Sequence, residues 1–347
     1  MVVLHVLQSD TFSGAENVAC QIIKLFENDK NIEMIYSSKD GKISDTLKEK
    51  KIFFAPMKNV SCFELKKIIK KYKPDIIHCH DVGASVKVAL VKSKNMKLIS
   101  HIHGNHPFMN RKSIKSCLYY LLSKKYNEII WVSDSCFDNF VFKEKLKQKS
   151  TILYNVVDTN KLMYYKKLDN KKYKYDVIFV GRLSEPKDPL RLIDVMKLVI
   201  EKTPNATLAI VGDGEFYNQI KEKIKKLSLD KNICLLGRIN NPMKILSDSK
   251  CMLMTSKHEG LPMCVLEAIT FGIPVVSTPT DGTKYLIENY DIGFVSNNNI
   301  ELADYINKII NQDKKTLLKR KEEIINYSLK INDINNYKKV IQDIYTK

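Results

Sequence analysis

Short apolar runs alternate with amphipathic stretches along the chain. Each short apolar run predicts a strand, and the runs span 2–7, 32–37, 75–79, 97–101, 128–132, 151–154, 176–180, 208–211, 233–236, 251–255, 274–277 and 293–295. Apolar residues with helical spacing predict helices at 16–28, 61–72, from 189 onward, at 215–227 and within 301–347. Because strands separated by helices form parallel sheets with helices on both faces, the pattern predicts an α/β protein.

A polar segment separates two halves with this alternation. Residues 158–175 are rich in lysine and show no clear periodicity, so we interpret them as a linker. A chain of 347 residues has the length of about two domains. We therefore expect domains at 1–160 and 174–329, followed by a C-terminal helix at 330–347.

Strands in the second half end at glycine or small polar residues. Gly181-Arg182, Gly212-Asp213-Gly214 and Gly237-Arg238 each follow an apolar run. In open parallel sheets, ligands bind just beyond the carboxyl ends of the strands. Asp188-Pro189 is expected to cap and begin the next helix, since proline at the first helical position loses no required N–H.

The composition narrows the partners and the compartment. Lys and Arg number 57 against 39 Asp and Glu, a net charge of +18, which favours anionic partners or reflects a lysine-rich solvated surface. No apolar run has the length of a membrane span, and the N-terminus does not resemble a signal peptide. Eight scattered cysteines fit free thiols in a reducing compartment, so we expect a cytoplasmic protein.

The segment 258–268 carries the strongest local signal. Glu259 and Glu267 stand eight positions apart, with a Gly260-Leu261-Pro262 turn between them and an apolar helical face after it. We expect Glu259 to end a strand, and the helix that begins near Pro262 offers free N–H groups to an anion. A solvent-facing glutamate pair on a plain strand–turn–helix is the alternative, but the turn and the Glu-Ala pair favour a binding site.

These residues resemble the signature of retaining GT-B glycosyltransferases, in particular glycosyltransferase family 4. Further pieces resemble the family's motifs in the same order: Ser13-Gly14-Ala15-Glu16, Asp75–Asp81, His103-Gly104, Val132-Ser133, Asn155–Asp158, Gly181-Arg182-Leu183 with Lys187, Gly212-Asp213-Gly214 and Gly237. Ser13 and Asp188 stand where the family has glycine. The resemblance covers nearly the whole chain and is most specific over 176–295.

The resemblance implies two Rossmann-like domains that face each other across a cleft, with the last helix crossing back to the first domain. The C-terminal domain would bind the nucleotide-sugar and the N-terminal domain the acceptor. The implied reaction is retaining transfer of a hexose-type sugar, with UDP as the expected nucleotide, to a surface glycan or lipid-linked oligosaccharide. Capsule and exopolysaccharide synthesis are the expected pathways.

The implied donor site combines cations, glycines and carboxylates. Arg182 and Lys187 can bind the diphosphate, because a guanidinium fork and an ammonium match phosphate oxygens. Gly14 would let the opposing loop approach the diphosphate. By resemblance Glu259 contacts the donor sugar and Glu267 the ribose. No Asp-x-Asp motif is present, so we expect no metal and no cofactor, the nucleotide-sugar being a substrate.

Histidines cluster in the first half. The members are His78, His80, His101 and His103, followed by His106. Metal ligation and a buried core role both remain open, although the two-residue spacing is expected to turn each pair to opposite faces and prevent simple chelation. The resemblance favours His103, next to Gly104, as the active-site histidine, with His101 as the competitor.

Segment 108–125 mixes cations with apolar residues. If it is helical, it is either an interfacial membrane helix or an ordinary surface helix whose apolar side joins the core. Two other functions compete with glycosyl transfer. A GT-B nucleotide-sugar epimerase is disfavoured by the Arg182, Lys187 and paired-glutamate set. A basic nucleic-acid-binding module is disfavoured because lysines are diffuse and the only tryptophan, Trp131, lies in an apolar run.

Overall fold

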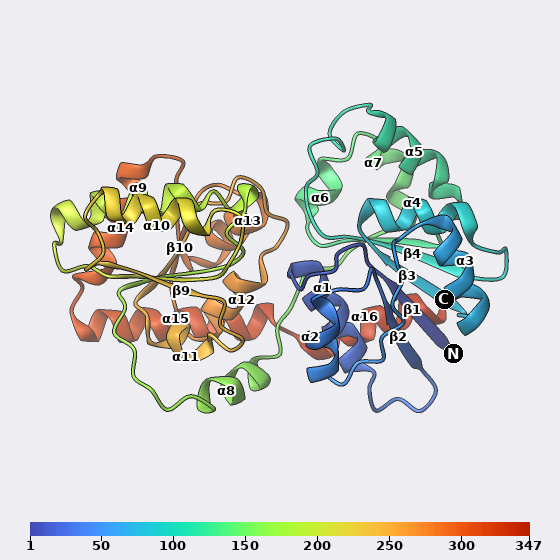
Figure 1. Ribbon diagram of the computed structural model, residues 1–347, viewed down its shortest axis with the longest axis horizontal. Helices are drawn as coiled ribbons and strands as arrows, with labels where there is room; N and C mark the ends of the chain where they lie inside the picture. Colours follow the sequence, from blue (N-terminus) through green and yellow to red (C-terminus); the bar gives the residue numbers. More distant parts are fainter. The chain divides into compact units, whose positions relative to one another are not determined.

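The structure, a computed structural model, describes residues 1–347 and divides into two compact units. Unit 1 contains Met1–Asn155 and Asn335–Lys347, and unit 2 contains Val156–Ile334. Each unit has one six-stranded sheet flanked by helices (Figure 1). All strand pairs are parallel, as the alternating pattern predicts, so the α/β class is confirmed.

The sheet of unit 1 has the strand order β2-β1-β3-β4-β5-β6. Its strands are β1 (Val2–Val6), β2 (Glu33–Ser37), β3 (Ile76–His80), β4 (Lys97–Ile102), β5 (Glu128–Trp131) and β6 (Ser150–Ile152). Its helices are α1 (Gly14–Leu25), α2 (Ile43–Glu49), α3 (Cys62–Tyr72), α4 (Asp81–Val91), α5 (Ile114–Leu122), α6 (Asp134–Asp138), α7 (Lys143–Leu146) and α16 (Ile334–Thr346). The chain order reverses between β1 and β3, which makes the carboxyl ends of these strands the expected binding edge.

The sheet of unit 2 has the order β12-β11-β10-β7-β8-β9. Its strands are β7 (Val177–Val180), β8 (Leu208–Val211), β9 (Ile233–Gly237), β10 (Cys251–Met254), β11 (Val275–Ser277) and β12 (Gly293–Val295). Its helices are α8 (Thr159–Lys167), α9 (Pro189–Lys202), α10 (Tyr217–Lys226), α11 (Met243–Asp248), α12 (Met263–Thr270), α13 (Asp281–Tyr290), α14 (Asn299–Ile310) and α15 (Lys314–Ile331). This is the strand order of the dinucleotide-binding Rossmann fold, whose ligands bind where the order reverses, here between β7 and β10.

The cores explain why both sheets are covered on two faces. In β3, β8 and β10 every residue is buried, and apolar residues on successive positions point to opposite sides of the sheet. Helices on both faces therefore exclude water from each strand. In unit 2, for example, Leu192 of α9 and Ile306 of α14 pack in one cluster with the strand residue Leu208.

Two local predictions are corrected by the structure. The polar linker segment contains helix α8, which packs against α11 and α12 inside unit 2. Its start is stabilised because the Asp158 side chain accepts a hydrogen bond from the Lys161 N–H, and only Leu162 is buried, which explains the missing periodicity. Asp188 precedes α9 but makes no side-chain cap hydrogen bond, since its backbone adopts a left-handed conformation (φ +43°).

Candidate functional site

The carboxyl ends of β7 and β10 bring together the donor-site candidates of unit 2. Arg182 follows β7 after a single glycine, and Lys187 ends a short 3-10 helix, η3 (Glu185–Lys187). Glu259 lies in the loop between β10 and α12. The expectation that Glu259 ends a strand is wrong, because β10 ends at Met254 and an irregular segment of several residues follows.

Lys187 and Glu259 form an ion pair at this edge. The Lys187 ammonium donates to Glu259 Oε1, and the Ser256 hydroxyl donates to the same oxygen at 2.9 Å. The two charged side chains are 21% and 13% exposed. Burial acts to lower the pKa of Lys187, but attraction to Glu259 outweighs it and holds the pKa above its ordinary value. Arg182 lies close enough to oppose this shift through repulsion.

A glycine turn leads from Glu259 into α12. Leu261 is buried at 3% exposure, and Pro262 is the residue that precedes the first turn of the helix. Gly282, in the first turn of α13, packs directly against the carbonyl of Gly260, and a Cβ at this position would overlap that oxygen. The turn therefore lies against the amino end of α13 and continues into the amino end of α12, where helix N–H groups lack intrahelical partners.

Cys264 is a member of this region that sequence reasoning missed. Burial is the main reason that the pKa of its thiol rises to about 12, with Lys187 opposing the rise and Glu259 and Glu267 adding to it. The thiol is therefore neutral at physiological pH and within electrostatic reach of the three charged groups. The predicted Glu267 is half-buried on α12 in the same region.

Gly237 is not brought to the β7–β10 edge. It ends β9, which is separated from β7 by β8. Its backbone is left-handed (φ +69°), and its carbonyl accepts a hydrogen bond from the Gly212 N–H at 2.8 Å. Gly212 in turn packs so closely on the Gly181 carbonyl that a Cβ would overlap it. The strand-end glycines therefore form a backbone-packed row and Gly237 occupies its far end.

In unit 1 the predicted loop residue Gly14 is the first residue of α1. Ser13 precedes the helix, and its hydroxyl is hydrogen bonded to the Glu16 carboxylate. A Cβ at Gly14 would have nothing within 4 Å, so the structure leaves open space at this position.

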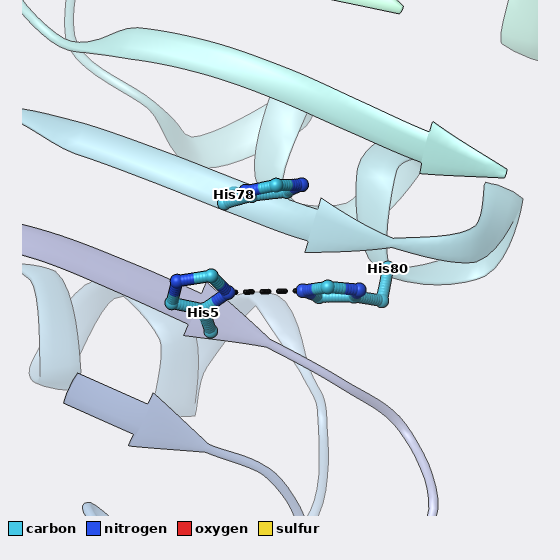
Figure 2. A group of neighbouring side chains, drawn as sticks. All are labelled: His5, His78 and His80. Carbon is cyan, nitrogen blue, oxygen red and sulfur yellow. Dashed lines mark hydrogen bonds between the residues drawn. The ribbon is translucent and has the colours of Figure 1, made fainter. Parts of the chain in front are cut away.

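The clustered histidines share one side of the unit 1 sheet. The expectation that each pair faces opposite sides is wrong, because side chains two residues apart on a strand point the same way. The rings of His78 and His80, drawn in Figure 2, lie nearly parallel. Their centroids are 4.7 Å apart and their planes differ by 9°. The rings of His101 and His103 stack at 4.2 Å.

Two further residues complete the cluster and were missed from the sequence. His5 on β1 lies opposite His78 in the strand register, and its ring nitrogen Nδ1 is 3.0 Å from His80 Nε2 (Figure 2). Tyr345 of α16 reaches His78 Nδ1 at 2.8 Å. Burial lowers the pKa of His5 to about 3 and also lowers those of His78 and His80, so these rings are neutral.

His101 and His103 differ in their burial. His101 lies within β4 and is fully buried, whereas His103 follows the strand and is half-buried. The His103 backbone N–H donates to Asp81 Oδ1 at 2.9 Å. Burial lowers the pKa of both rings, and the Asp81 carboxylate partly opposes this for His103.

Comparisons with known proteins agree with this fold. The model of Glycosyltransferase Family 4 matches residues 39–161, and that of Glycosyl transferases group 1 matches 163–330. An Escherichia coli relative, UDP-Gal:alpha-D-GlcNAc-diphosphoundecaprenol alpha-1,3-galactosyltransferase, is 27% identical over 342 residues, covering 89% of this chain and 87% of its own. An uncharacterized glycosyltransferase of Methanocaldococcus jannaschii is 35% identical over 237 residues, covering 62% of this chain and 58% of its own.

A solved structure supports the same architecture. The crystal structure of Anabaena HepE in complex with UDP is 20% identical, covers 100% of both chains and has a TM-score of 0.84. The fold and the family matches define this chain as a GT-B glycosyltransferase. Within that class it belongs to the glycosyl transferases group 1, with the family 4 type of N-terminal half. None of its helices combines the length and apolar character needed to cross a membrane.

Proposed function

We propose that this glycosyltransferase is a retaining hexosyltransferase that uses a UDP-sugar and a glycan or lipid-linked acceptor in capsule or exopolysaccharide synthesis. One observation carries the proposal: Arg182, Lys187 and Glu259 gather where the strand order of unit 2 reverses. Two cations and a carboxylate at this place suit a diphosphate joined to a sugar. The UDP-Gal specificity of the Escherichia coli relative and the UDP bound to Anabaena HepE support this donor class.

The proposed chemistry uses the ion pair as a precursor of the donor complex. The diphosphate takes the place of Glu259 as partner of Lys187, and Arg182 binds a second phosphate oxygen. Glu259 is then free to accept hydrogen bonds from the sugar hydroxyls. As the glycosidic bond breaks, negative charge grows on the phosphate, and the two cations stabilise that charge without a metal ion.

Retention follows if the acceptor hydroxyl enters from the face that the phosphate leaves. The departing phosphate oxygen then takes the hydroxyl proton, so no pair of carboxylates like that of a glycosidase is required. We assign His103 to the acceptor side of the reaction, because it lies beyond the end of β4 while His101 is enclosed within the strand.

A panel of nucleotide-sugars tests this function. UDP-sugars should raise the melting temperature of the purified protein more than GDP- or ADP-sugars, and the donor that stabilises most should be consumed with a lipid-linked acceptor. Analysis of the product linkage should show retention of the anomeric configuration. Release of free sugar without an acceptor would instead indicate an epimerase or a hydrolase, and inversion would contradict the proposed reaction course.

The surface of α5 supports a place for the enzyme at an anionic membrane. Ile114, Leu118 and Leu121 follow helical spacing and are 89%, 39% and 63% exposed. Phe108 and Leu122, two other apolar residues of segment 108–125, instead pack against the core of unit 1. The helix itself spans only Ile114–Leu122, because Ser113 begins it with a capping box.

Five cations lie within or next to α5 in the sequence. They are Arg111, Lys112, Lys115, Lys124 and Lys125. Lys125 donates to the Ala89 carbonyl at 2.7 Å, so its charge is partly engaged within the unit. Each cation near an anionic surface contributes about 1 kcal/mol, which salt screens. We therefore propose that α5 docks on anionic lipid through its apolar stripe and these charges.

Sedimentation with vesicles tests the docking. We expect binding to anionic vesicles that falls at high salt, and little binding to neutral vesicles. A triple variant in which Ile114, Leu118 and Leu121 are all replaced by serine should lose this binding. Leu329→Ser is the matched control, because Leu329 is 60% exposed on α15 of unit 2. Binding that ignores lipid charge, or an equal loss in the control, would refute this surface without affecting the glycosyltransferase assignment.

A further inference from the structure

The buried histidines of unit 1 form a hydrogen-bonded chain with two arms. In the first arm His103 Nε2 is 2.8 Å from His80 Nδ1, and His80 Nε2 is 3.0 Å from His5 Nδ1. The arm ends where His5 Nε2 lies 3.3 Å from the sulfur of Met34 on β2. The other ring nitrogen of His103, Nδ1, is buried and has no hydrogen-bond partner.

The second arm runs through the C-terminal helix. Tyr345 Oη is 2.8 Å from His78 Nδ1, and His78 Nε2 is 3.2 Å from His101 Nδ1. His101 Nε2 is buried without a partner. Tyr345 Oη also lies 3.5 Å from His5 Nε2, so the two arms meet at His5.

A shared metal ion does not fit this arrangement. The two three-histidine groups whose nitrogens are mutually close each contain a stacked pair, His78 with His80 or His101 with His103. An ion bound through imidazole lies in the plane of the ring, about 2.0–2.1 Å from the nitrogen for zinc. An ion in the plane of one stacked ring is out of the plane of the other.

The Met34 sulfur determines where the protons of the first arm lie. A thioether accepts hydrogen bonds and never donates, and a neutral imidazole has one N–H and one acceptor nitrogen. The Tyr345 hydroxyl, the other neighbour of His5 Nε2, is 3.5 Å from it but only 2.8 Å from His78 Nδ1. The 3.3 Å contact with Met34 therefore assigns the proton to His5 Nε2, which leaves His5 Nδ1 to accept from His80 Nε2–H. His80 Nδ1 then accepts from His103 Nε2–H, and His103 Nδ1 is left as a lone pair.

The second arm has the same polarity. Because His5 Nε2 already carries a proton, it cannot accept one from Tyr345, so the phenol donates to His78 Nδ1. His78 Nε2–H then donates to His101 Nδ1, and His101 Nε2 carries an unpaired N–H. The five histidines of this hydrogen-bonded chain are thus in the same tautomer, with the proton on Nε2.

We propose that Met34, acting through His5 and His80, is a positioning residue that fixes His103 with a hydrogen-bond acceptor at Nδ1. This inference rests on the proposed function for its consequence in turnover, but not for the tautomer itself. His103 Nδ1 is enclosed in the free protein, so this lone pair meets a substrate hydroxyl only where substrate binding uncovers it. Once uncovered, Nδ1 can accept a hydrogen bond from a hydroxyl and cannot donate one to a phosphate oxygen. For a substrate that uncovers Nδ1, the histidine chain thereby selects a hydrogen-bond donor as the partner of His103.

Nitrogen NMR of ¹⁵N-histidine-labelled full-length protein tests the tautomers without substrate. The wild type should show Nε2 protonation and an unprotonated Nδ1 for every histidine of the chain, with His103 assigned by loss of its signals in His103→Gln. In Met34→Leu the proton on His5 Nε2 loses its acceptor, and the Tyr345 hydroxyl can then donate to an unprotonated His5 Nε2 instead of to His78, which reverses the first arm. We expect about half or more of His103 to move its proton to Nδ1.

The matched controls separate this effect from packing. Met57→Leu makes the same exchange at another buried methionine of unit 1, and it should leave the spectrum unchanged. Tyr345→Phe should alter His78 and His101 but leave His103 unchanged, because the first arm still ends at Met34. Tyr337→Phe is its control, since the Tyr337 hydroxyl is buried without a partner on the same helix.

Turnover provides the functional readout. If about half of the enzyme molecules hold the wrong tautomer, kcat of Met34→Leu falls about two-fold or more while KM for the donor is unchanged. Protonation of His103 at Nδ1 in the wild type, or an unchanged spectrum in Met34→Leu, would overturn the proposal. Because the spectra need no substrate, they remain decisive even if the proposed donor is not turned over.

Discussion

Replacement of Glu259 by glutamine should separate nucleotide binding from sugar transfer. In the free protein the Glu259 carboxylate neutralises Lys187, and in the proposed donor complex it binds the sugar. The amide keeps the size of the side chain but removes the charge. Lys187 then meets the diphosphate without a competing carboxylate, while the sugar loses a charge-assisted hydrogen bond.

The exposed fractions of the pair, 21% and 13%, place it between a surface and a buried ion pair. Exposed pairs contribute up to about 1 kcal/mol, and removing one partner of a buried pair costs about 3–5 kcal/mol. We therefore expect Glu259→Gln to reduce the free energy of unfolding by about 1–3 kcal/mol. Release of Lys187 from about 1–2 kcal/mol of competition should raise the affinity for UDP about 5- to 30-fold.

Transfer should respond in the opposite direction. Loss of a charge-assisted contact that strengthens in the transition state lowers turnover on the order of 10²-fold. Calorimetry with UDP and a transfer assay with the UDP-sugar measure the two effects on the same sample. The control is Glu201→Gln on α9, whose pair with Lys197 is more than half exposed at both ends.

One combination of results would refute this reasoning. Weaker UDP binding together with normal turnover would mean that Glu259 supports the nucleotide and does not contact the sugar. A control variant with equal losses would mean that any glutamate exchange disturbs unit 2. The opposed changes in affinity and turnover are specific to the switch of partner at Lys187.

Other changes test neighbouring parts of the site. Arg182→Ala should cost about 2–4 kcal/mol in transition-state stabilisation while the melting curve stays close to wild type, and near-normal turnover would remove Arg182 from the donor site. Transfer should continue in excess EDTA. If EDTA abolished activity and added Mg²⁺ or Mn²⁺ restored it, Arg182 and Lys187 would not replace a metal. Because the folded-state pKa of Lys187 is raised, its pair with Glu259 stabilises the fold fully below pH 10.5 and loses this effect as pH rises through the higher folded value. The difference in unfolding free energy between the wild type and Glu259→Gln should therefore shrink above pH 10.5. A difference that stays constant would contradict the pairing. Gly282→Ala should destabilise unit 2 by about 1–3 kcal/mol in denaturant unfolding, because its Cβ meets a carbonyl oxygen. Gly14→Ala is the control, since its Cβ has open space. A cost for Gly282→Ala no larger than that of the control would contradict this close packing.

Local patterns in the sequence were enough to predict the strands and the edge at which the donor-site candidates gather. Apolar runs and the glycines after them predict β7 to β12 within one or two residues. In the central strands β8 and β10 the reason is burial on both faces, which requires apolar residues throughout. Arg182 and Glu259 follow strands that a Rossmann order brings side by side, so motif and topology point to the same edge. Strand order itself still required the structure, since parallel neighbours are distant in the chain.

Side-chain partners over long separations were decided only by the tertiary structure. Lys187 and Glu259 are 72 residues apart, and the spacing within each motif contains no information on which cation meets which carboxylate. The same holds for α5, where Leu122 and Leu121 are adjacent and equally apolar, yet one packs on the core and the other is exposed. The packing of α5 fixes its rotation about its own axis, and this rotation decides which of the two leucines is buried.

The histidine chain shows the limit most clearly. The sequence placed four histidines in two short segments, but their common side of the sheet, their stacking and their neutrality come from strand register and burial. Tyr345 lies 267 residues from His78, and Met34 is an unremarkable apolar residue of β2. A hydrogen-bond chain depends on atoms from β1, β2, β3, β4 and α16 within about 3 Å of one another, and only the folded packing determines such distances.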